Sequence, residues 1–290
     1  MITPLNFNFA MLARLAAASV MTAGLVAGAV AGPASAHPKE TIDYVALGDS
    51  YSAGLGAGPT TDLTCFQTPG SFPDRIDARK SVNLIANASC SGATTTDIFA
   101  PDVKRALQPQ AASLTKETDL VTITIGGNDV GFGKVATACP GNPASIDCKT
   151  AIENALFAAE NSLPTGLFAA FSTIQANAPY AHVVVLGYPQ LLSPQFGTFG
   201  TSTQGAVALN SATAQLNALI EAAARGFGFQ YVDVTQEFRN HGVGSPDPWI
   251  RPGEPAVFHP TAEGYKKGYF KAFKSEVQLN KVQEKSHSYQ

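Results

Sequence analysis

Charged residues are scarce in this chain, and no region concentrates charge of one sign. Asp, Glu, Lys and Arg make up 14% of the 290 residues, and the net charge is −3. The basic residues form no stripe of the kind that binds a phosphate backbone. The sequence therefore argues against nucleic acid as a partner, and it gives no basis for electrostatic docking on an anionic membrane.

Charge is almost absent from the first 36 residues, where Arg14 is the one charged side chain. An apolar, alanine-rich run from Leu15 to Gly32 precedes Ala34-Ser35-Ala36, whose small side chains suit cleavage. This combination predicts a secretory signal peptide over residues 1–36. A membrane anchor is the alternative, but the run is barely long enough to span a bilayer and is diluted by Gly, Ser and Thr. No later run approaches that length, so we expect a secreted, extracellular protein whose mature chain has no integral membrane segment.

The mature chain, residues 37–290, is long enough for one large domain with a buried core. It contains no internal repeat and no shift of composition that would mark a domain boundary. The polar tail from about residue 280 is expected to fray. We therefore expect a single domain and a monomeric protein.

Metal-binding patterns are lacking as well. The chain has four cysteines, with no Cys-x-x-Cys spacing and no nearby histidine cluster, so we expect no metal site. An even number of cysteines in an exported chain predicts disulfides instead. Of the three possible connectivities we favour Cys65–Cys90 with Cys139–Cys148, because each closes a segment beside a candidate active-site loop.

Short, β-branched and apolar segments alternate with segments of helical spacing along the chain. The predicted strands are Ile42–Gly48, Val82–Ala88, Leu120–Gly126, His182–Gly187 and Phe229–Val234. The predicted helices are Thr96–Leu107, Lys149–Ala178 with a break near Pro164, Thr203–Gly226, and Thr261 to about Val277. This pattern predicts an α/β fold with a three-layer, doubly wound (flavodoxin-like) sheet of about five parallel strands. Ligands of such sheets bind beyond the carboxyl ends of the strands.

Three polar turns follow predicted strands and should meet at that edge of the sheet. They contain Ser50, Gly92 and Asn128. An apolar strand that runs into a tight turn and delivers a serine hydroxyl exposes a nucleophile in α/β enzymes, so Ser50 is the candidate nucleophile. Asp49 is expected to pin the turn, and Ser52 lies too far into the following element.

A serine hydroxyl needs a base, and five histidines are available. His259 is the candidate, because the proline and the helix after it fix where its ring points. His37 begins the mature chain and His287 lies in the tail, so both are poor candidates. His182 heads a strand and suits a structural role, while His241 stays open as an alternative.

Acyl transfer also needs hydrogen-bond donors aimed at the developing oxyanion. The backbone N–H groups of Ser50 and Gly92 and the side-chain amide of Asn128 are the candidates. Glycine at position 92 lets the peptide approach a substrate closely. Asp129 is expected to take part in the Asn-Asp turn and bond the loop backbone.

These blocks, in this order, resemble the SGNH (GDSL) hydrolase family, especially its secreted actinobacterial lipases and esterases. The resemblance runs from Tyr44 to Pro260, and the ordered set is far more specific than any single block. It implies that Ser50 is the nucleophile, His259 the general base, and Gly92 and Asn128 oxyanion-hole residues. The two cysteine pairs also resemble disulfides of secreted members.

One departure from the family concerns the residue that orients His259. Many members carry Asp three residues before the histidine, where this chain has Ala256. Some similar lipases use a main-chain carbonyl instead, and the carbonyl of Val257 is our candidate. Glu254 and Asp247 are the alternatives from the same loop.

We expect a serine esterase or lipase that needs no cofactor and hydrolyses carboxylic esters, with lipid esters, including phospholipids, ahead of other substrates. A carbohydrate acetylesterase is the alternative, and a non-catalytic binding protein on the same scaffold is a further one. Apolar residues of the connecting segments are candidates to line an acyl groove, with ordinary packing as the alternative for each: Phe132, Phe196, Phe199 and Trp249.

Overall fold

Five parallel strands form the central sheet in the computed structural model, which describes residues 41–139, 145–197 and 202–287. The strands are β1 (Ile42–Gly48), β2 (Val82–Asn87), β3 (Leu120–Thr124), β4 (His182–Leu186) and β5 (Gln230–Val232). Their order in the sheet is β2-β1-β3-β4-β5, which confirms the predicted doubly wound fold. The predicted signal peptide, His37, Phe199 and the side chain of His287 lie outside the described residues.

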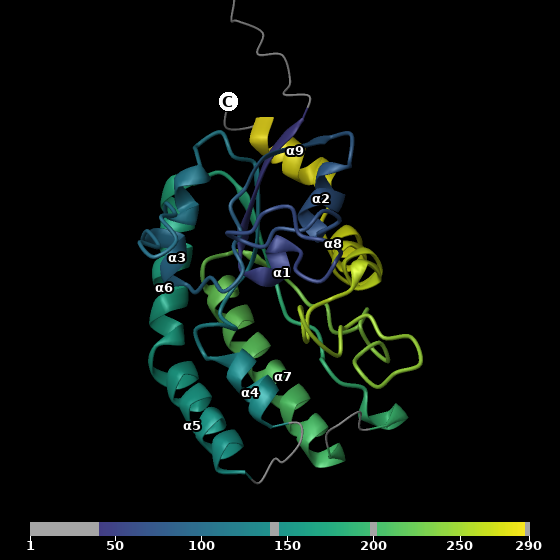
Figure 1. The fold of residues 1–290 in the computed structure, drawn as a ribbon. Coiled ribbons are helices and arrows are strands. Elements are labelled where there is room, and N and C mark those ends of the chain that lie inside the picture. Colours follow the sequence, from purple (N-terminus) through teal and green to yellow (C-terminus); the bar gives the residue numbers. More distant parts are fainter. Residues whose placement is uncertain (1–40, 140–144, 198–201, 288–290) are drawn as a thin grey trace, which may run out of the picture. The chain divides into compact units, whose positions relative to one another are not determined.

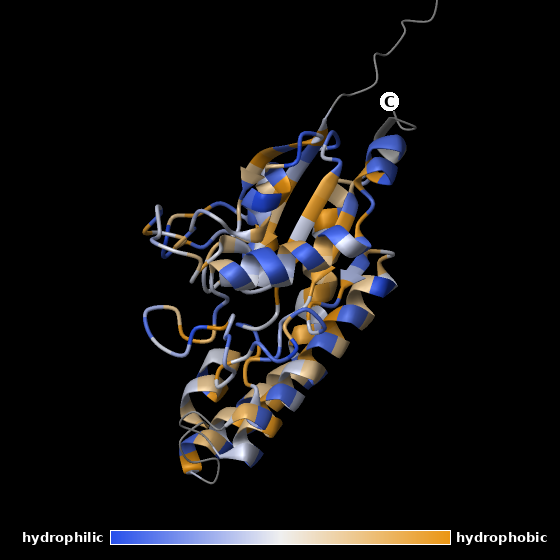
Figure 2. Cartoon of the chain, turned by 90° about the vertical axis from the view of Figure 1, so that its right-hand side faces the viewer, coloured by the Kyte–Doolittle hydropathy of each residue, from blue (hydrophilic) through white to orange (hydrophobic). Residues whose placement is uncertain are grey.

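The side chains of the strands alternate between two apolar cores, because successive residues of a strand face opposite sides of the sheet. Tyr44 and Ala46 face one core, and Val45 and Leu47 face the other. Helices α2 (Phe72–Asp77), η3 (Gly264–Tyr269) and α8 (Phe270–Glu276) contribute to the first core. Helices α3 (Thr96–Phe99) and α6 (Leu163–Asn177) contribute to the second, and α7 (Thr203–Gly226) to both. Figure 1 shows α2 and α8 on one side of the sheet and α3 and α6 on the other, and Figure 2 shows that the strands are largely hydrophobic.

Three other helices complete the parts that concern the site. The four-residue α1 (Ser50–Ala53) follows β1, and α4 (Phe132–Ala138) follows the turn after β3. Helix α5 (Ile146–Asn161) packs beside α4 and α6, and the chain breaks between α5 and α6 at Ser162, close to the predicted position. Short 3₁₀ turns at η1 (Gln110–Ser113) and η2 (Pro194–Phe196) occupy connecting segments.

Two predicted segments differ from the structure. The predicted helix Thr96–Leu107 ends at Phe99, because Ala100 precedes a proline and adopts extended backbone angles. The tail that was expected to fray from about residue 280 forms helix α9 (Leu279–His287). Val282 explains the second difference, since its side chain is buried in the core.

Strands β1 and β3 are neighbours in the sheet. From β1 the chain continues to β2 on one side, and from β3 it continues to β4 on the other, so the strand order reverses between β1 and β3. Ligands of doubly wound sheets bind at such a switch point. The ends of the two strands are level there, with Gly48 opposite Thr124. The turns that carry Ser50 and Asn128 therefore begin side by side.

Residues Pro38–Gln290 form one compact unit. Within the described ranges, no helix is both long and apolar enough to cross a membrane. The same ranges hold no group of three or more His, Cys, Asp or Glu side chains arranged to bind a metal ion.

Candidate active site

The turn after β1 presents Ser50 at the carboxyl edge of the sheet. Gly48 ends the strand with a φ of 122°, and a Cβ atom there would lie 2.4 Å from the carbonyl oxygen of Thr124. Glycine is therefore required at this position. Asp49 caps α1 by accepting the N–H of Tyr51 at 3.0 Å, which places Ser50 at the first helical position.

Asp49 is buried beneath this turn and does not reach His259. Its carboxylate accepts hydrogen bonds from the Tyr51 N–H, the Thr124 hydroxyl at 2.8 Å and the Tyr188 hydroxyl. Burial raises the pKa of Asp49 to about 6, and these hydrogen bonds oppose the rise. The side chain thus pins the turn, as the sequence predicted.

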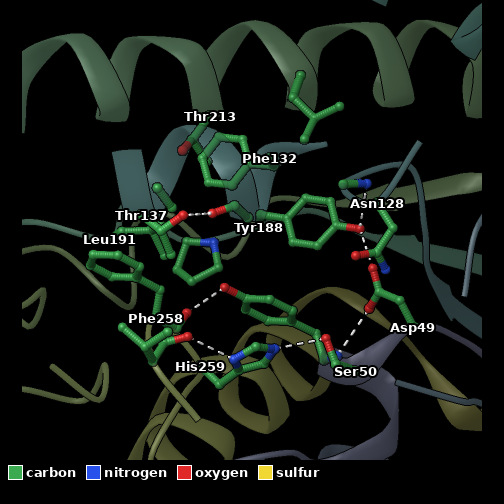
Figure 3. A pocket seen from close by; sticks show the side chains of 17 residues that line it. Asp49, Ser50, Asn128, Phe132, Thr137, Tyr188, Leu191, Thr213, Phe258 and His259 are labelled. Carbon is green, nitrogen blue, oxygen red and sulfur yellow. Dashed lines mark hydrogen bonds between the residues drawn. The ribbon is translucent and has the colours of Figure 1, made fainter. Parts of the chain in front are cut away.

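His259 lies against Ser50, although 209 residues separate them in the chain. The imidazole Nε2 is 2.7 Å from the Ser50 Oγ, and the imidazole Nδ1 is 2.9 Å from the carbonyl oxygen of Val257. A carbonyl oxygen can only accept a hydrogen bond, so Nδ1 carries the proton and Nε2 is free to accept the serine O–H. Figure 3 shows this line of contacts beside the pocket.

The pKa of His259 is lowered, because burial disfavours the charged imidazolium. The hydrogen bonds to the backbone of Val257 and Ala256 act in the opposite direction and only partly compensate. The ring is therefore neutral at neutral pH, which is the form that accepts a proton.

Neither candidate carboxylate contacts His259. The Asp247 carboxylate accepts the Trp249 indole N–H at 3.1 Å and lies 3.5 Å from Nδ1 of His241. Glu254 is exposed, and within the described part of the chain no hydrogen bond or ion pair joins it to the imidazole. Ala256 itself is buried.

The other two described histidine rings are bound elsewhere. His182 Nε2 lies 2.8 Å from the side-chain oxygen of Gln230, at the far edge of the sheet from Ser50. His241 stacks on Trp249 with 3.6 Å between ring centroids, and its Nδ1 lies 2.8 Å from the carbonyl oxygen of Asp247. These contacts give both rings packing roles.

The backbone just before His259 is strained. Phe258 has a φ of 60°, in the left-handed region, which costs a residue other than glycine about 1–3 kcal/mol. Three hydrogen bonds hold this loop: Phe258 N–H to the Arg251 carbonyl at 2.9 Å, His259 N–H to the Ala256 carbonyl at 3.1 Å, and the Tyr51 hydroxyl to the Phe258 carbonyl at 2.6 Å.

Asn128 follows β3 and lines the same pocket as Ser50 and His259. Its side-chain Nδ2 donates to the carbonyl oxygen of Ala93 at 2.8 Å, which leaves the second proton of the amide for another acceptor. The neighbouring Asp129 binds the backbone N–H of Thr95 at 3.1 Å, as the sequence predicted for a loop contact. These bonds join the turn after β3 to the segment that follows Gly92.

Gly92 is exposed and does not belong to the pocket lining. A Cβ atom at this position would meet no protein atom within 4 Å, so the surrounding fold leaves room for a side chain. The φ of Gly92 is 83°, a backbone angle that other residues adopt at a cost. That glycine at this position also lets the peptide approach a substrate stays a prediction.

Two disulfides support these loops, with the pairing that the sequence favoured. Cys65–Cys90 joins the segment after α1 to the Gly92 turn, and the Ser91 N–H also donates to the Cys65 carbonyl at 2.9 Å. Cys139–Cys148 joins the end of α4 to α5.

An apolar pocket with a cavity of about 170 Å³ opens from Ser50 and His259 toward α4 and α7. Figure 3 shows Phe132, Thr137 and Thr213 across the pocket from these two residues. Both threonine hydroxyls already donate to backbone carbonyls, Thr137 to Gly133 and Thr213 to Leu209. The hydroxyls of Thr137 and Thr213 are therefore already paired, and the mainly apolar lining offers apolar contacts to an acyl chain.

The pocket lining differs from the aromatic groove that the sequence suggested. Phe132 does line it, but Phe196 is exposed and Trp249 is buried against His241. The lining that the sequence missed includes residues after β4 and along α4 and α7: Ala136, Thr137, Tyr188, Pro189, Leu191, Thr213 and Leu216. The strand-edge rule that selected Ser50 would also have found Tyr188, since it closely follows β4. No sequence signal shows which helical residues face the cavity.

Comparison with known proteins identifies the family. A model described as "GDSL-like Lipase/Acylhydrolase family" matches residues 46–267. The chain belongs to this family. It is 35% identical to a lipase of Streptomyces rimosus over 269 residues, which cover 91% of this chain and 97% of that one.

Solved structures agree with this assignment. The extracellular lipase of Streptomyces rimosus superposes with a TM-score of 0.72 at 35% identity, covering 82% of this chain and all of that one. Phospholipase A1 of Streptomyces albidoflavus NA297 gives a TM-score of 0.71 at 34% identity with the same coverage. As a member of this family with these relatives, the protein is a carboxylic ester hydrolase.

Proposed function

We propose that the protein is a secreted lipase that hydrolyses lipid esters through an acyl-enzyme on Ser50. The observation that carries this proposal is the 2.7 Å contact between the Ser50 hydroxyl and the neutral His259 ring. It lies at the mouth of an apolar pocket, where the carbonyl carbon of an ester could meet the hydroxyl while its acyl chain is buried.

In the proposed reaction, Ser50 Oγ attacks the ester carbonyl carbon as its proton passes to His259 Nε2. The resulting tetrahedral oxyanion accepts hydrogen bonds from Ser50 N–H, Gly92 N–H and the free N–H of Asn128. The carbon–oxygen bond to the alcohol then breaks, and His259 returns the proton to the departing alkoxide. The product of this step is an acyl-enzyme and a free alcohol.

Water completes the cycle by the same roles in reverse. His259 takes a proton from water as its oxygen attacks the acyl carbonyl, and then protonates Ser50 Oγ as the carboxylic acid leaves. Throughout, Val257 accepts the Nδ1 hydrogen and keeps the ring in one tautomer. A carbonyl stabilises the imidazolium less than a carboxylate does, because it carries no net charge.

Lipid esters are the proposed substrates for two reasons. The inner pocket wall is apolar and its threonine hydroxyls are already satisfied. Two relatives that match most of the chain at 35% and 34% identity are named lipase and phospholipase A1. Secretion is proposed from the predicted signal peptide at residues 1–36 together with the two disulfides, which persist in oxidising compartments. We propose a monomer, since each catalytic group comes from one chain.

The test is Ser50→Ala in the purified mature protein, assayed on p-nitrophenyl esters from acetyl to long acyl chains. Removing a serine nucleophile should lower kcat by at least about 10⁴-fold, because the attacking oxygen is lost. Ser52→Ala is the matched control, since Ser52 lies in the same helix as Ser50 but its hydroxyl is buried against Thr124 of β3. Retained turnover in Ser50→Ala would refute the mechanism, and a preference for acetylated xylan over every lipid ester would refute the proposed substrate class.

A further inference from the structure

The side chain of Tyr51 reaches from the helix that carries Ser50 to the loop that carries His259. Its hydroxyl donates to the carbonyl oxygen of Phe258 at 2.6 Å, and its ring lies 5.0 Å from the imidazole, centroid to centroid. Ser50 and Tyr51 are consecutive residues of α1. The Ser50 hydroxyl contacts the imidazole, and the Tyr51 hydroxyl contacts the peptide that precedes His259.

Phe258 is the residue on which the placement of the imidazole depends. The carbonyl that binds Nδ1 belongs to Val257, on one side of it, and the ring belongs to His259, on the other. Its own backbone lies in the left-handed region, with a φ of 60°, which phenylalanine does not favour. The Arg251 carbonyl binds the N–H of this residue, and within the described ranges the Tyr51 hydroxyl is the donor to its carbonyl oxygen.

Within the ranges that the structure describes, no charged side chain bonds to the His259 imidazole. The position that holds an acid in many similar enzymes is Ala256, and the Asp247 carboxylate is bound to Trp249. A carboxylate would attract the imidazolium whatever the small movements of the loop, but a carbonyl binds Nδ1 only while the loop keeps its shape. The loop geometry must therefore be held by other contacts.

The Tyr51 ring is itself held in place. It packs edge-to-face on Tyr188, with 5.1 Å between centroids, and the Tyr188 hydroxyl binds the Asp49 carboxylate and the Gly127 N–H. Burial, with a smaller contribution from the nearby Asp49, raises the pKa of Tyr51 far above its ordinary range. The phenol is thus a hydrogen-bond donor at every pH at which the protein works.

We propose that Tyr51 is a positioning residue: its hydroxyl fixes the Phe258 peptide, so that Val257 and Ser50 hold His259 in the Nδ1–H tautomer. This inference rests on the proposed roles of Ser50 and His259. It assigns to the residue after the nucleophile part of the orienting task that a carboxylate performs in a Ser-His-Asp triad. The Tyr51 side chain lines the pocket, but its hydroxyl binds the Phe258 carbonyl and touches none of the reacting atoms in this scheme.

The experiment compares Tyr51→Phe with a matched control, Tyr265→Phe. Tyr265 is another buried tyrosine whose hydroxyl donates to a backbone carbonyl, that of Leu55 at 2.9 Å, and within the described ranges it forms no hydrogen bond to residues 256–259. Both variants lose one hydroxyl and one hydrogen bond. Each is measured for kcat and KM on p-nitrophenyl acetate, for its thermal midpoint, and by NMR of ¹⁵N-histidine-labelled protein, with His259→Ala to assign the signal.

Tyr51→Phe should lower kcat by about tenfold or more with KM changed less than about threefold, because the misplaced ring affects proton transfer and not binding. The Nδ1–H signal of His259 should weaken or disappear, and Tyr265→Phe should keep both kcat and that signal. The inference is overturned if Tyr51→Phe keeps kcat within about threefold, if its Nδ1–H signal is unchanged, or if Tyr265→Phe loses as much activity. Turnover by Ser50→Ala would instead refute the proposed function itself.

Discussion

At the scale of single residues, the His259 ring binds a carbonyl oxygen, whereas the histidine of a Ser-His-Asp triad binds a carboxylate. The carbonyl of Val257 fixes which imidazole nitrogen carries the proton, but it adds no negative charge to stabilise the imidazolium. Burial then dominates the titration of His259 and lowers its pKa. Asp49 is the one acid in the serine turn, and its carboxylate stabilises the fold of that turn by accepting the hydroxyls of Thr124 and Tyr188.

This arrangement predicts a low acidic limit of activity. His259 accepts a proton only when neutral, so kcat/KM should fall as the pH drops through its pKa and level off above it. Because burial lowers that pKa, the midpoint of the acidic limb should lie below the ordinary histidine value of about 6.5. The measurement is the pH profile of kcat/KM on a short, soluble ester.

The control for this profile is the double variant Asp247→Asn with Glu254→Gln. Neither carboxylate contacts the imidazole, so the limb should stay in place when both are neutral. A midpoint near pH 7 or above in the unmodified protein would contradict the account, because an imidazole stabilised by a carboxylate titrates there.

At the scale of elements, strands and chemistry were more predictable than the pocket. Strand β1 matches its predicted range, and the apolar, β-branched pattern located the other four within a few residues. Ser50, Asn128 and His259 could be predicted because each stands at a strand end or before a helix, where local sequence fixes the position. Gly92 could be located too, but its backbone angle was not visible in the sequence.

What the sequence could not supply is the packing between elements. Helix α7 was predicted with its observed bounds, yet its periodicity does not say that Thr213 faces the cavity. Trp249 looked like a groove residue because it is aromatic and lies in a loop, but it packs under His241. The link from Tyr51 to Phe258 spans 207 residues, and no local pattern encodes it.

Helix α4 supplies part of the pocket lining, and this gives a prediction about acyl-chain length. Ala136 on α4 is buried and lines the pocket, so a larger side chain there should shorten the space for an acyl chain. Ala136→Leu and Ala136→Phe should progressively lower kcat/KM for p-nitrophenyl octanoate, by about tenfold or more in the larger variant, while acetate hydrolysis changes less. Lys134→Ala on the exposed face of α4 is the control.

Overpacking can also destabilise the protein, so the thermal midpoint of each variant accompanies the kinetics. If both folded variants keep the unmodified ratio of octanoate to acetate hydrolysis, the acyl chain does not occupy this cavity. The lipid assignment would then lose its structural support, while the ester chemistry at Ser50 would stand.

At the scale of the whole molecule, the sheet order is what makes the site possible. Strand β1 lies beside β3, so the turns that follow them start together, and the long connection after β5 brings His259 to Ser50. The Cys65–Cys90 disulfide adds the Gly92 turn to the same edge.

The most direct test is to find which residue of the protein a fluorophosphonate modifies. The reagent requires an activated serine, and mass spectrometry of the digested protein locates the adduct. We predict one adduct, on the peptide that contains Ser50, formed at least about a hundredfold more slowly in His259→Ala because the base is lost. An adduct on another residue, or a labelling rate that does not depend on His259, would contradict the account.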